Sequence, residues 1–98
     1  MLEVSLLPEA ADEFDAATDF YEARAAGLGW EFRAAVLATL HAIAENPRRF
    51  PRAIRQYRRA VLGRFPYAVF FTVENEGVVV AAVFHGSRDP KKLRDRLR

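Results

Sequence analysis

The chain has 98 residues, of which 51% are hydrophobic and 12% aromatic, and its formal net charge is +2. This length and composition indicate one globular domain spanning residues 1–98 and exclude a disordered chain. The absence of cysteine excludes disulfides and thiolate chemistry. No apolar run reaches the roughly 18 residues needed to cross a bilayer, and the first residues lack the features of a signal peptide. A soluble cytoplasmic protein is therefore expected.

Charge is distributed unevenly along the chain. Residues 1–30 carry seven acidic residues and one arginine, whereas residues 48–64 carry seven arginines and no acidic residue. The tail that begins at Arg88 adds six basic residues against two aspartates. Such asymmetry indicates a basic face that meets an anionic partner, either a nucleic acid or an acidic protein segment. The alternative is a solvated, arginine-rich surface without a partner.

The first half of the chain predicts one short strand and two amphipathic helices. Residues 2–6 alternate apolar and polar side chains, as in a strand with one face in water. Pro8 suits the first position of a helix, where its missing N–H costs nothing, and Gly27 suits a left-handed stop about five turns later. A second helix is predicted from near Trp30 to Glu45, where an Asn-Pro pair ends it. The short corner between the helices predicts an antiparallel hairpin.

The second half of the chain predicts three strands. Residues 48–54 are expected to form an irregular connector, and the strand over residues 56–62 carries arginines that suit the edge of a sheet. Two almost wholly apolar runs, residues 67–73 and 78–84, predict strands that are covered on both faces. The glycine of the Asn-Glu-Gly turn between them is expected to take a positive φ. After Arg88 the chain forms either a short basic helix or a frayed tail.

These elements predict an α+β domain with the element order β-α-α-β-β-β. The helical hairpin is expected to pack on a mostly antiparallel, four-stranded sheet in the order 2-3-4-1. In this arrangement the first strand lies beside the fourth, and counting chain reversals through the hairpin makes the two antiparallel. The hairpin covers one face of the sheet. The covering of the other face is left open, although both apolar strands require one.

Several short motifs occur in a fixed order over nearly the whole chain: Phe20-Tyr21, Leu28-Gly29, Phe32, Asn46-Pro47, Phe50-Pro51, Arg59, Phe65-Pro66-Tyr67, His85, Arg88 and Pro90. In this order they resemble the RelE/ParE superfamily of toxins from bacterial type II toxin–antitoxin systems, and specifically its ParE-like (plasmid stabilisation) branch. Similar proteins often carry a tryptophan three residues after the last proline, where this chain has Leu93.

One activity implied by the resemblance is RNA cleavage. Toxins similar to RelE cut messenger RNA in the ribosomal A site by attack of the 2′-hydroxyl on the adjacent phosphate. This reaction needs a base, positive charge on the phosphorane and an acid for the leaving oxygen. Arg59, Arg64 and Arg88 are candidates for the charge, and His85 is the candidate proton carrier. A histidine at the end of a buried strand also suits a structural role, in which it pins the following turn.

The other activity implied by the resemblance is non-enzymatic inhibition. ParE-like toxins poison DNA gyrase by protein–protein contact, with the helical hairpin and the tail implicated rather than a catalytic pocket. The long helices and the absence of Tyr, His or Trp from the tail favour this branch. Tyr57 and Tyr67 remain candidates for the second proton-transfer group of a nuclease. A third possibility is a non-catalytic module whose basic face binds RNA or DNA, and the chain is interpreted as leaning towards a non-enzyme.

The resemblance also implies a partner, namely a cognate acidic antitoxin encoded nearby. Such a chain would fold over the basic surface and the apolar surface beside it. We expect Arg58, Arg59, Arg64 and Arg88 to contribute to this interface, although Arg58 and Arg59 point to opposite faces of their strand. No cofactor, metal ion or membrane is expected to take part.

Overall fold

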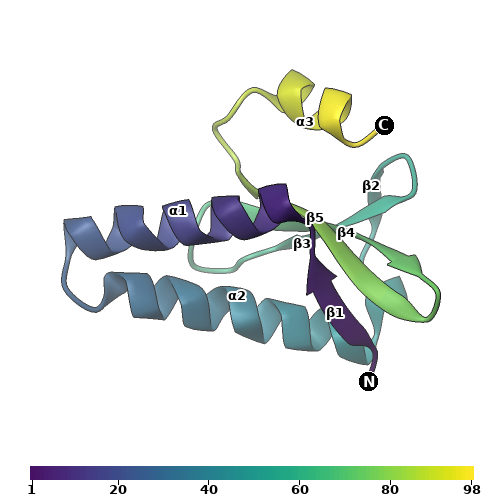
Figure 1. The fold of residues 1–98 in the computed structure, drawn as a ribbon, viewed down its shortest axis with the longest axis horizontal. Helices are drawn as coiled ribbons and strands as arrows, with labels where there is room; N and C mark the ends of the chain where they lie inside the picture. The colour runs from purple at the N-terminus through teal and green to yellow at the C-terminus, as the bar shows by residue number, and fades with distance from the viewer.

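The computed structural model describes residues 1–98 and shows a helical hairpin, a five-stranded sheet and a short C-terminal helix (Figure 1). The α+β class and the helical hairpin are as predicted. None of the helices is both long and apolar enough to cross a membrane. The elements in chain order are β1 (Glu3–Leu6), α1 (Pro8–Arg24), α2 (Leu28–Glu45), a 3-10 turn η1 (Pro47–Arg49), β2 (Arg52–Ile54), β3 (Tyr57–Val61), β4 (Tyr67–Glu74), β5 (Gly77–His85) and α3 (Pro90–Arg96).

The helical hairpin is closed by a glutamate and two glycines at its corner. Gly27 has a φ of +88° and precedes the first residue of α2. The Glu22 carboxylate of α1 accepts hydrogen bonds of 2.9 Å from the N–H groups of Gly27 and Gly29, which lie where a helix leaves its amides without partners. A Cβ at Gly29 would lie 2.8 Å from the carbonyl oxygen of Thr18. Glycine at this position therefore lets the two helices approach closely.

The sheet has five strands in the order β1-β5-β4-β3-β2, so the predicted four strands in the order 2-3-4-1 are wrong in number and order. The expected connector contains β2, which pairs with β3 and takes the edge position expected of the arginine-rich strand. The first strand does lie beside the last, but the two are parallel, with Val4 opposite Val78. The additional strand adds one chain reversal between α2 and β3, which inverts the predicted direction.

The helical hairpin covers one face of the sheet, as predicted. Five aromatic rings from both helices and the β3–β4 region meet in this layer, and the centroids of Tyr21 and Phe65 are 5.0 Å apart. Burying each large apolar side chain contributes about 1.5–3 kcal/mol relative to exposure. The largest fully buried side chains of this layer are Phe32, Val36, Ile43, Val69, Phe71, Val78, Val80 and Val83.

The opposite face of the sheet is covered in part by α3, which lies on the other side of the molecule from α2 (Figure 1). The tail is thus a helix, and Asp89 caps it by accepting a hydrogen bond of 2.9 Å from the N–H of Lys91. Leu93 and Leu97 of the tail are buried with side chains of β4 and β5, namely Phe70, Ala81, Ala82 and Phe84. The chain itself therefore supplies much of the second cover that the apolar strands require.

Glu13 of α1 joins the hairpin, the sheet and α3. Its carboxylate accepts hydrogen bonds from the backbone N–H of Val83 at 2.9 Å and from the Arg96 guanidinium at 2.8 and 2.9 Å. It also accepts one from Arg88 at 3.1 Å. The pairing of β1 with β5 ends at Val80, so Glu13 binds an amide that a longer β1 would have bound. The hydrogen bonds to Glu13 raise the pKa of Arg96.

The turn between β4 and β5 differs from the prediction. Its positive φ angles belong to Asn75 (49°) and Glu76 (63°), whereas Gly77 is the first residue of β5. Because Glu74 pairs with Gly77, the turn has two central residues, Asn75 and Glu76. Both central positions of a type I′ turn require a positive φ. Asparagine tolerates this region, but glutamate is strained there.

Replacing Glu76 by glycine should therefore stabilise the protein. Relief of the strained φ is expected to raise the free energy of unfolding by about 0.5–1 kcal/mol, measured by urea unfolding. The matched control is Glu74→Gly, the same change in an extended residue of β4, which should lower that free energy by about 0.5–1 kcal/mol. Destabilisation by both changes would contradict the assignment of strain to Glu76.

Replacing Glu13 by glutamine should loosen α3. The change removes the negative charge between Arg88 and Arg96 and is expected to cost about 2 kcal/mol of unfolding free energy. Amide exchange in residues 90–98 should become faster, because α3 loses its ionic attachment to α1. The control is Glu9→Gln, since Glu9 is exposed and lies 3.5 Å from Arg96; it should cost about 0.5 kcal/mol or less. Equal effects of the two changes would show that Glu13 has no special role.

Candidate partner-binding groove

A groove lies beside α3 on the sheet face that α3 covers, and it encloses about 350 Å³. Its apolar lining includes Val61, Phe70, Phe84 and Leu93, from β3, β4, β5 and α3 in turn. Its titratable residues are Arg59, Tyr67, His85 and Arg88, and no carboxylate lines it. The groove therefore suits an apolar segment that also carries negative charge.

The two neighbouring arginines of β3 have different surroundings. The Arg58 guanidinium donates hydrogen bonds to the carbonyl oxygens of Phe50 at 2.6 Å and Arg48 at 3.4 Å. It thus braces the segment that leads from α2 to β2. Arg59 is exposed and lines the groove. Because successive residues of a strand point to opposite faces, only Arg59 offers its charge to a ligand in the groove.

The other two predicted arginines are engaged by carboxylates. Arg64 lies outside the groove and forms an ion pair of 2.7 Å with Glu31 of α2. Arg88 lines the groove, but its guanidinium is 3.1 Å from the Glu13 carboxylate and 4.5 Å from the ring centroid of Phe84. Of the four arginines expected to share one partner surface, the structure brings together Arg59 and Arg88.

His85 is placed in the groove with a structural contact of its own. Its Nδ1 accepts a hydrogen bond of 2.9 Å from the N–H of Ser87, so the proton of the neutral ring is assigned to Nε2. Its ring packs edge-on against Tyr67, with the centroids 5.0 Å apart. Burial and the neighbouring Tyr21 raise the pKa of Tyr67 above its usual value, so its hydroxyl is a weaker acid than that of an exposed tyrosine. Tyr57 does not line the groove.

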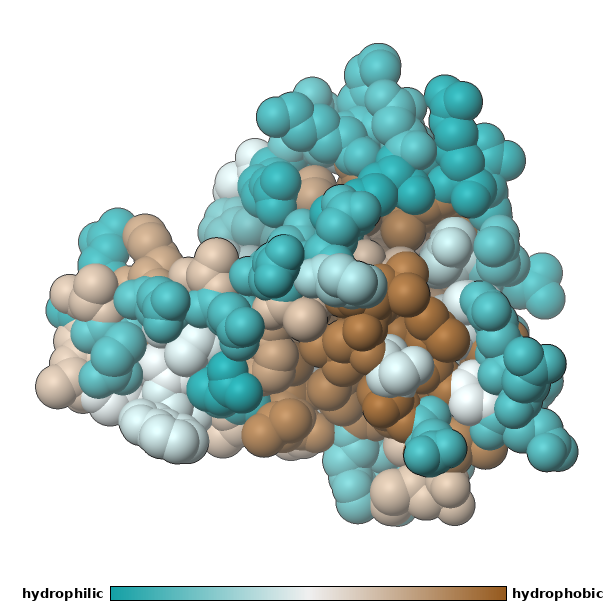
Figure 2. All heavy atoms as spheres, viewed as in Figure 1, coloured by the Kyte–Doolittle hydropathy of each residue, from teal (hydrophilic) through white to brown (hydrophobic).

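Sequence reasoning missed two contributors to this site. Glu13 holds Arg88 at one end of the groove, but an acidic residue near the start of a helix is ordinarily explained by the helix dipole. Val61 is 66% exposed and lines the groove, but valine is a common residue in any strand. Neither residue has a local pattern that marks it. On the side drawn in Figure 2, the hydrophilic side chains of α3 border a hydrophobic patch over the sheet.

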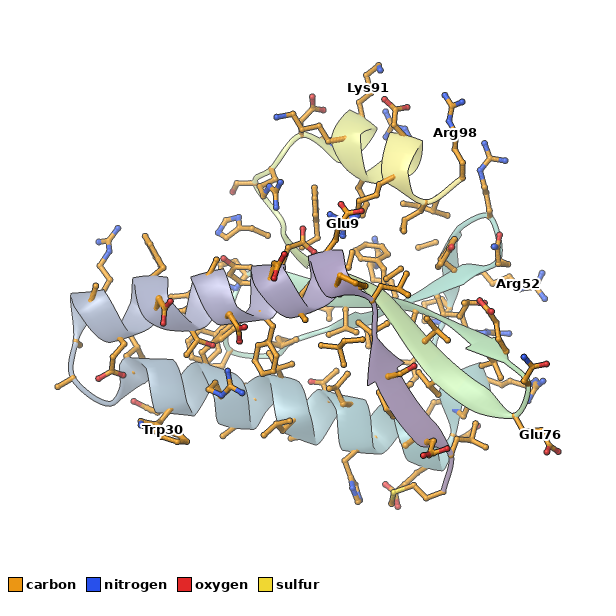
Figure 3. The ribbon with its side chains drawn as sticks, in the orientation of Figure 1. Glu9, Trp30, Arg52, Glu76, Lys91 and Arg98 are labelled. Atoms are coloured by element: carbon orange, nitrogen blue, oxygen red, sulfur yellow. The ribbon has the colours of Figure 1, made fainter.

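A second exposed surface belongs to the helical hairpin. Trp30 is 75% exposed and Leu37 is 53% exposed. These residues are seven positions apart on α2, which places them on one side of the helix. Figure 3 shows Trp30 pointing outward near the hairpin corner, at the end of the molecule remote from Arg98. Exposed aromatic residues of this kind are frequent anchors of protein–protein contacts.

Comparison with known proteins agrees with the fold. A family model described as the ParE toxin of type II toxin-antitoxin system, parDE, matches residues 4–90. No curated protein matches the chain. Among solved structures, a chain of the chromosomal ParDE toxin–antitoxin system from P. aeruginosa superposes with a TM-score of 0.74 at 17% identity, covering 87% of this chain and 96% of that chain. Because the family model spans most of the sequence, the chain belongs to the ParE toxin family of type II toxin–antitoxin systems.

Proposed function

We propose that the protein inhibits bacterial growth by binding DNA gyrase, and that a cognate acidic antitoxin neutralises it by docking in the groove beside α3. Membership of the ParE family supports the toxin role and the existence of an antitoxin partner. The choice of gyrase rests on the resemblance to ParE-like toxins. The proposed site of action is the cytoplasm, where gyrase acts on the chromosome.

The residues that line the groove favour binding of a partner over catalysis. Cleavage by a 2′-hydroxyl needs one group that takes a proton and another that gives one. The groove offers His85, whose Nδ1 is occupied by Ser87, and Tyr67, whose pKa is raised. Arg59 and Arg88 supply positive charge there, but no carboxylate is present to act as the base. Arg64, the third charge candidate, is paired with Glu31 outside the groove.

The same groove has the features that an acidic, partly apolar segment requires. Its apolar lining can bury an aliphatic or aromatic side chain, as the anchors of peptide-binding grooves do. Arg59 lines the groove without a carboxylate beside it, and a guanidinium forks readily onto an incoming Asp or Glu. An antitoxin segment with an apolar anchor next to an acidic residue would match both the apolar lining and the Arg59 guanidinium.

Removing the charge of Arg59 should weaken antitoxin binding. For Arg59→Gln, we expect an affinity loss of about tenfold for the product of an adjacent acidic reading frame, measured by titration calorimetry. The matched control is Arg64→Gln, which removes one positive charge outside the groove and should leave the affinity within about twofold. Equal losses for the two variants would contradict docking in the groove.

The hairpin surface with Trp30 and Leu37 is the proposed contact with gyrase. It lies on α2, whereas the groove lies on the opposite face of the sheet. Truncation of an exposed tryptophan anchor commonly costs about 2 kcal/mol or more of binding free energy. The two surfaces are therefore expected to respond separately to substitution.

Induced expression of Trp30→Ala tests the gyrase proposal. The wild-type protein should cause filamentation with trapped gyrase–DNA complexes and intact transcripts, and Trp30→Ala should require about tenfold more toxin for the same effect. His85→Ala should remain toxic. Val61→Ala, in the groove, is the matched control and should trap gyrase as the wild type does. Site-specific transcript cleavage that His85→Ala abolishes would instead establish a nuclease.

A further inference from the structure

One end of the molecule collects positive charge from two segments that are far apart in sequence. Arg52 and Arg55 belong to β2 and the β2–β3 turn, and Arg94 and Arg98 belong to the tail; all four are exposed. Figure 3 shows Arg52 and Arg98 pointing outward on the same side, and Trp30 lies at the opposite end. This basic end is distinct from the groove, since none of these four arginines lines it.

The buried face of α3 determines where its arginines point. Leu93 and Leu97 pack on the sheet, and Arg96 reaches back to Glu13 of α1 at 2.8 Å. Arg98 follows the end of α3. Successive residues of a helix are rotated by about 100°, so Arg94 lies on the flank opposite Arg96. That flank faces the β2–β3 hairpin, whose Ile54 and Tyr57 pack against the same cluster as Leu93. The two groups of arginines are thereby placed on one surface.

The β2–β3 turn holds its arginine in an unfavourable backbone conformation. Arg55 has a φ of +53°, a left-handed value that residues with a side chain rarely adopt. Glycine or asparagine would adopt this turn more easily. The strained arginine is exposed at the tip of the hairpin, where it adds a charge to the basic end.

The charges of the basic end are almost free of partners within the chain. The ion pairs of the protein include none that involves Arg52, Arg55 or Arg94. Arg98 is 3.7 Å from Asp95, and both side chains are largely exposed, so this pair contributes little. The guanidinium groups are therefore available to an external anion.

We propose that this basic end binds double-stranded nucleic acid through its backbone phosphates. Protein interfaces have an apolar centre, but no large exposed hydrophobic residue belongs to β2, the β2–β3 turn or the tail. The large exposed hydrophobic residues of the chain are Met1, Leu7, Phe20, Trp30, Leu37 and Val61. Binding of single strands uses exposed aromatic rings for stacking, and the exposed rings here, Phe20 and Trp30, belong to the helical hairpin. Charge without apolar or aromatic surface is the property that phosphate contacts require.

The rest of the charge distribution sets the orientation of a bound duplex. Glu9 and Glu13 of α1 are paired with Arg96 of α3, whereas the acidic residues Asp15, Asp19 and Glu22 lie farther along α1, beside α2. These charges repel phosphate, so a duplex approaches the basic end and leaves the hairpin directed away from it. A protein bound in this way would keep its hairpin free for another partner. Duplex binding by the basic end requires neither gyrase nor an antitoxin.

The experiment is a fluorescence anisotropy titration of a labelled DNA duplex of about 20 base pairs at several salt concentrations. With four phosphate contacts, log Kobs should fall against log salt concentration with a slope of about −3.6, and binding should be micromolar near 50 mM salt. The variant Arg55→Gln/Arg94→Gln/Arg98→Gln should flatten the slope by about 2.7 and lose at least about tenfold in affinity at 50 mM salt. Its thermal unfolding should match the wild type, because all three side chains are exposed.

The matched control is Arg24→Gln/Arg33→Gln/Arg64→Gln, which removes the same number of charges from the hairpin and its neighbourhood. It should retain the slope and bind within about threefold of the wild type. Equal losses for the two triple variants, or no binding of a duplex at low salt, would overturn the proposal. Stronger displacement by oligoglutamate than by unlabelled duplex at equal charge would also overturn it. A double-stranded RNA competitor distinguishes the two kinds of duplex, and displacement by either one supports phosphate recognition.

Discussion

The carboxylate of Glu13 is the interaction on which the arrangement of the functional surfaces depends. It lies beyond the end of β1 and accepts hydrogen bonds from the backbone N–H of Val83 and from the guanidinium groups of Arg88 and Arg96. Only 13% of its side chain is exposed, so these contacts form in a region that is poor in water, where a charge without partners would be costly. Through Arg96 it fixes α3 against the sheet, and through Arg88 it fixes one wall of the groove. Helix, sheet and tail are thus tied at a single residue.

This attachment divides the molecule into three surfaces with different chemistry. The groove combines an apolar lining with the charge of Arg59 and suits an acidic, partly apolar chain. The hairpin exposes Trp30 and Leu37 beside acidic residues and suits a protein target. The basic end has charge without apolar surface and suits phosphate. The three surfaces are formed by different residues, although α3 contributes Leu93 to the groove and Arg94 to the basic end.

The sequence predictions are accurate where a structure depends on neighbouring residues, and they fail where it depends on distant ones. The two helices could be predicted closely, because Pro8, Gly27 and the Asn-Pro pair act within a turn of the boundaries that they mark. The two apolar strands were equally clear. The strand Arg52–Ile54 was missed because three residues without alternation give no signal. That omission alone inverted the direction predicted for β1 relative to β5, because each additional strand reverses the direction of the chain once more.

The sequence by itself determined the family, the helical hairpin and the set of basic residues from which a partner surface could be built. Tertiary structure decided which of those residues share a surface. Arg58 donates a hydrogen bond to a backbone carbonyl oxygen, and Arg64 is paired with Glu31. Arg59 lines the groove without an ion-pair partner. The contacts of Glu13 with Arg88 and Arg96 span 75 and 83 residues. Helix and turn signals are read from neighbouring residues, but the pairing of a charge depends on contacts between distant segments, which exist only once the chain has folded.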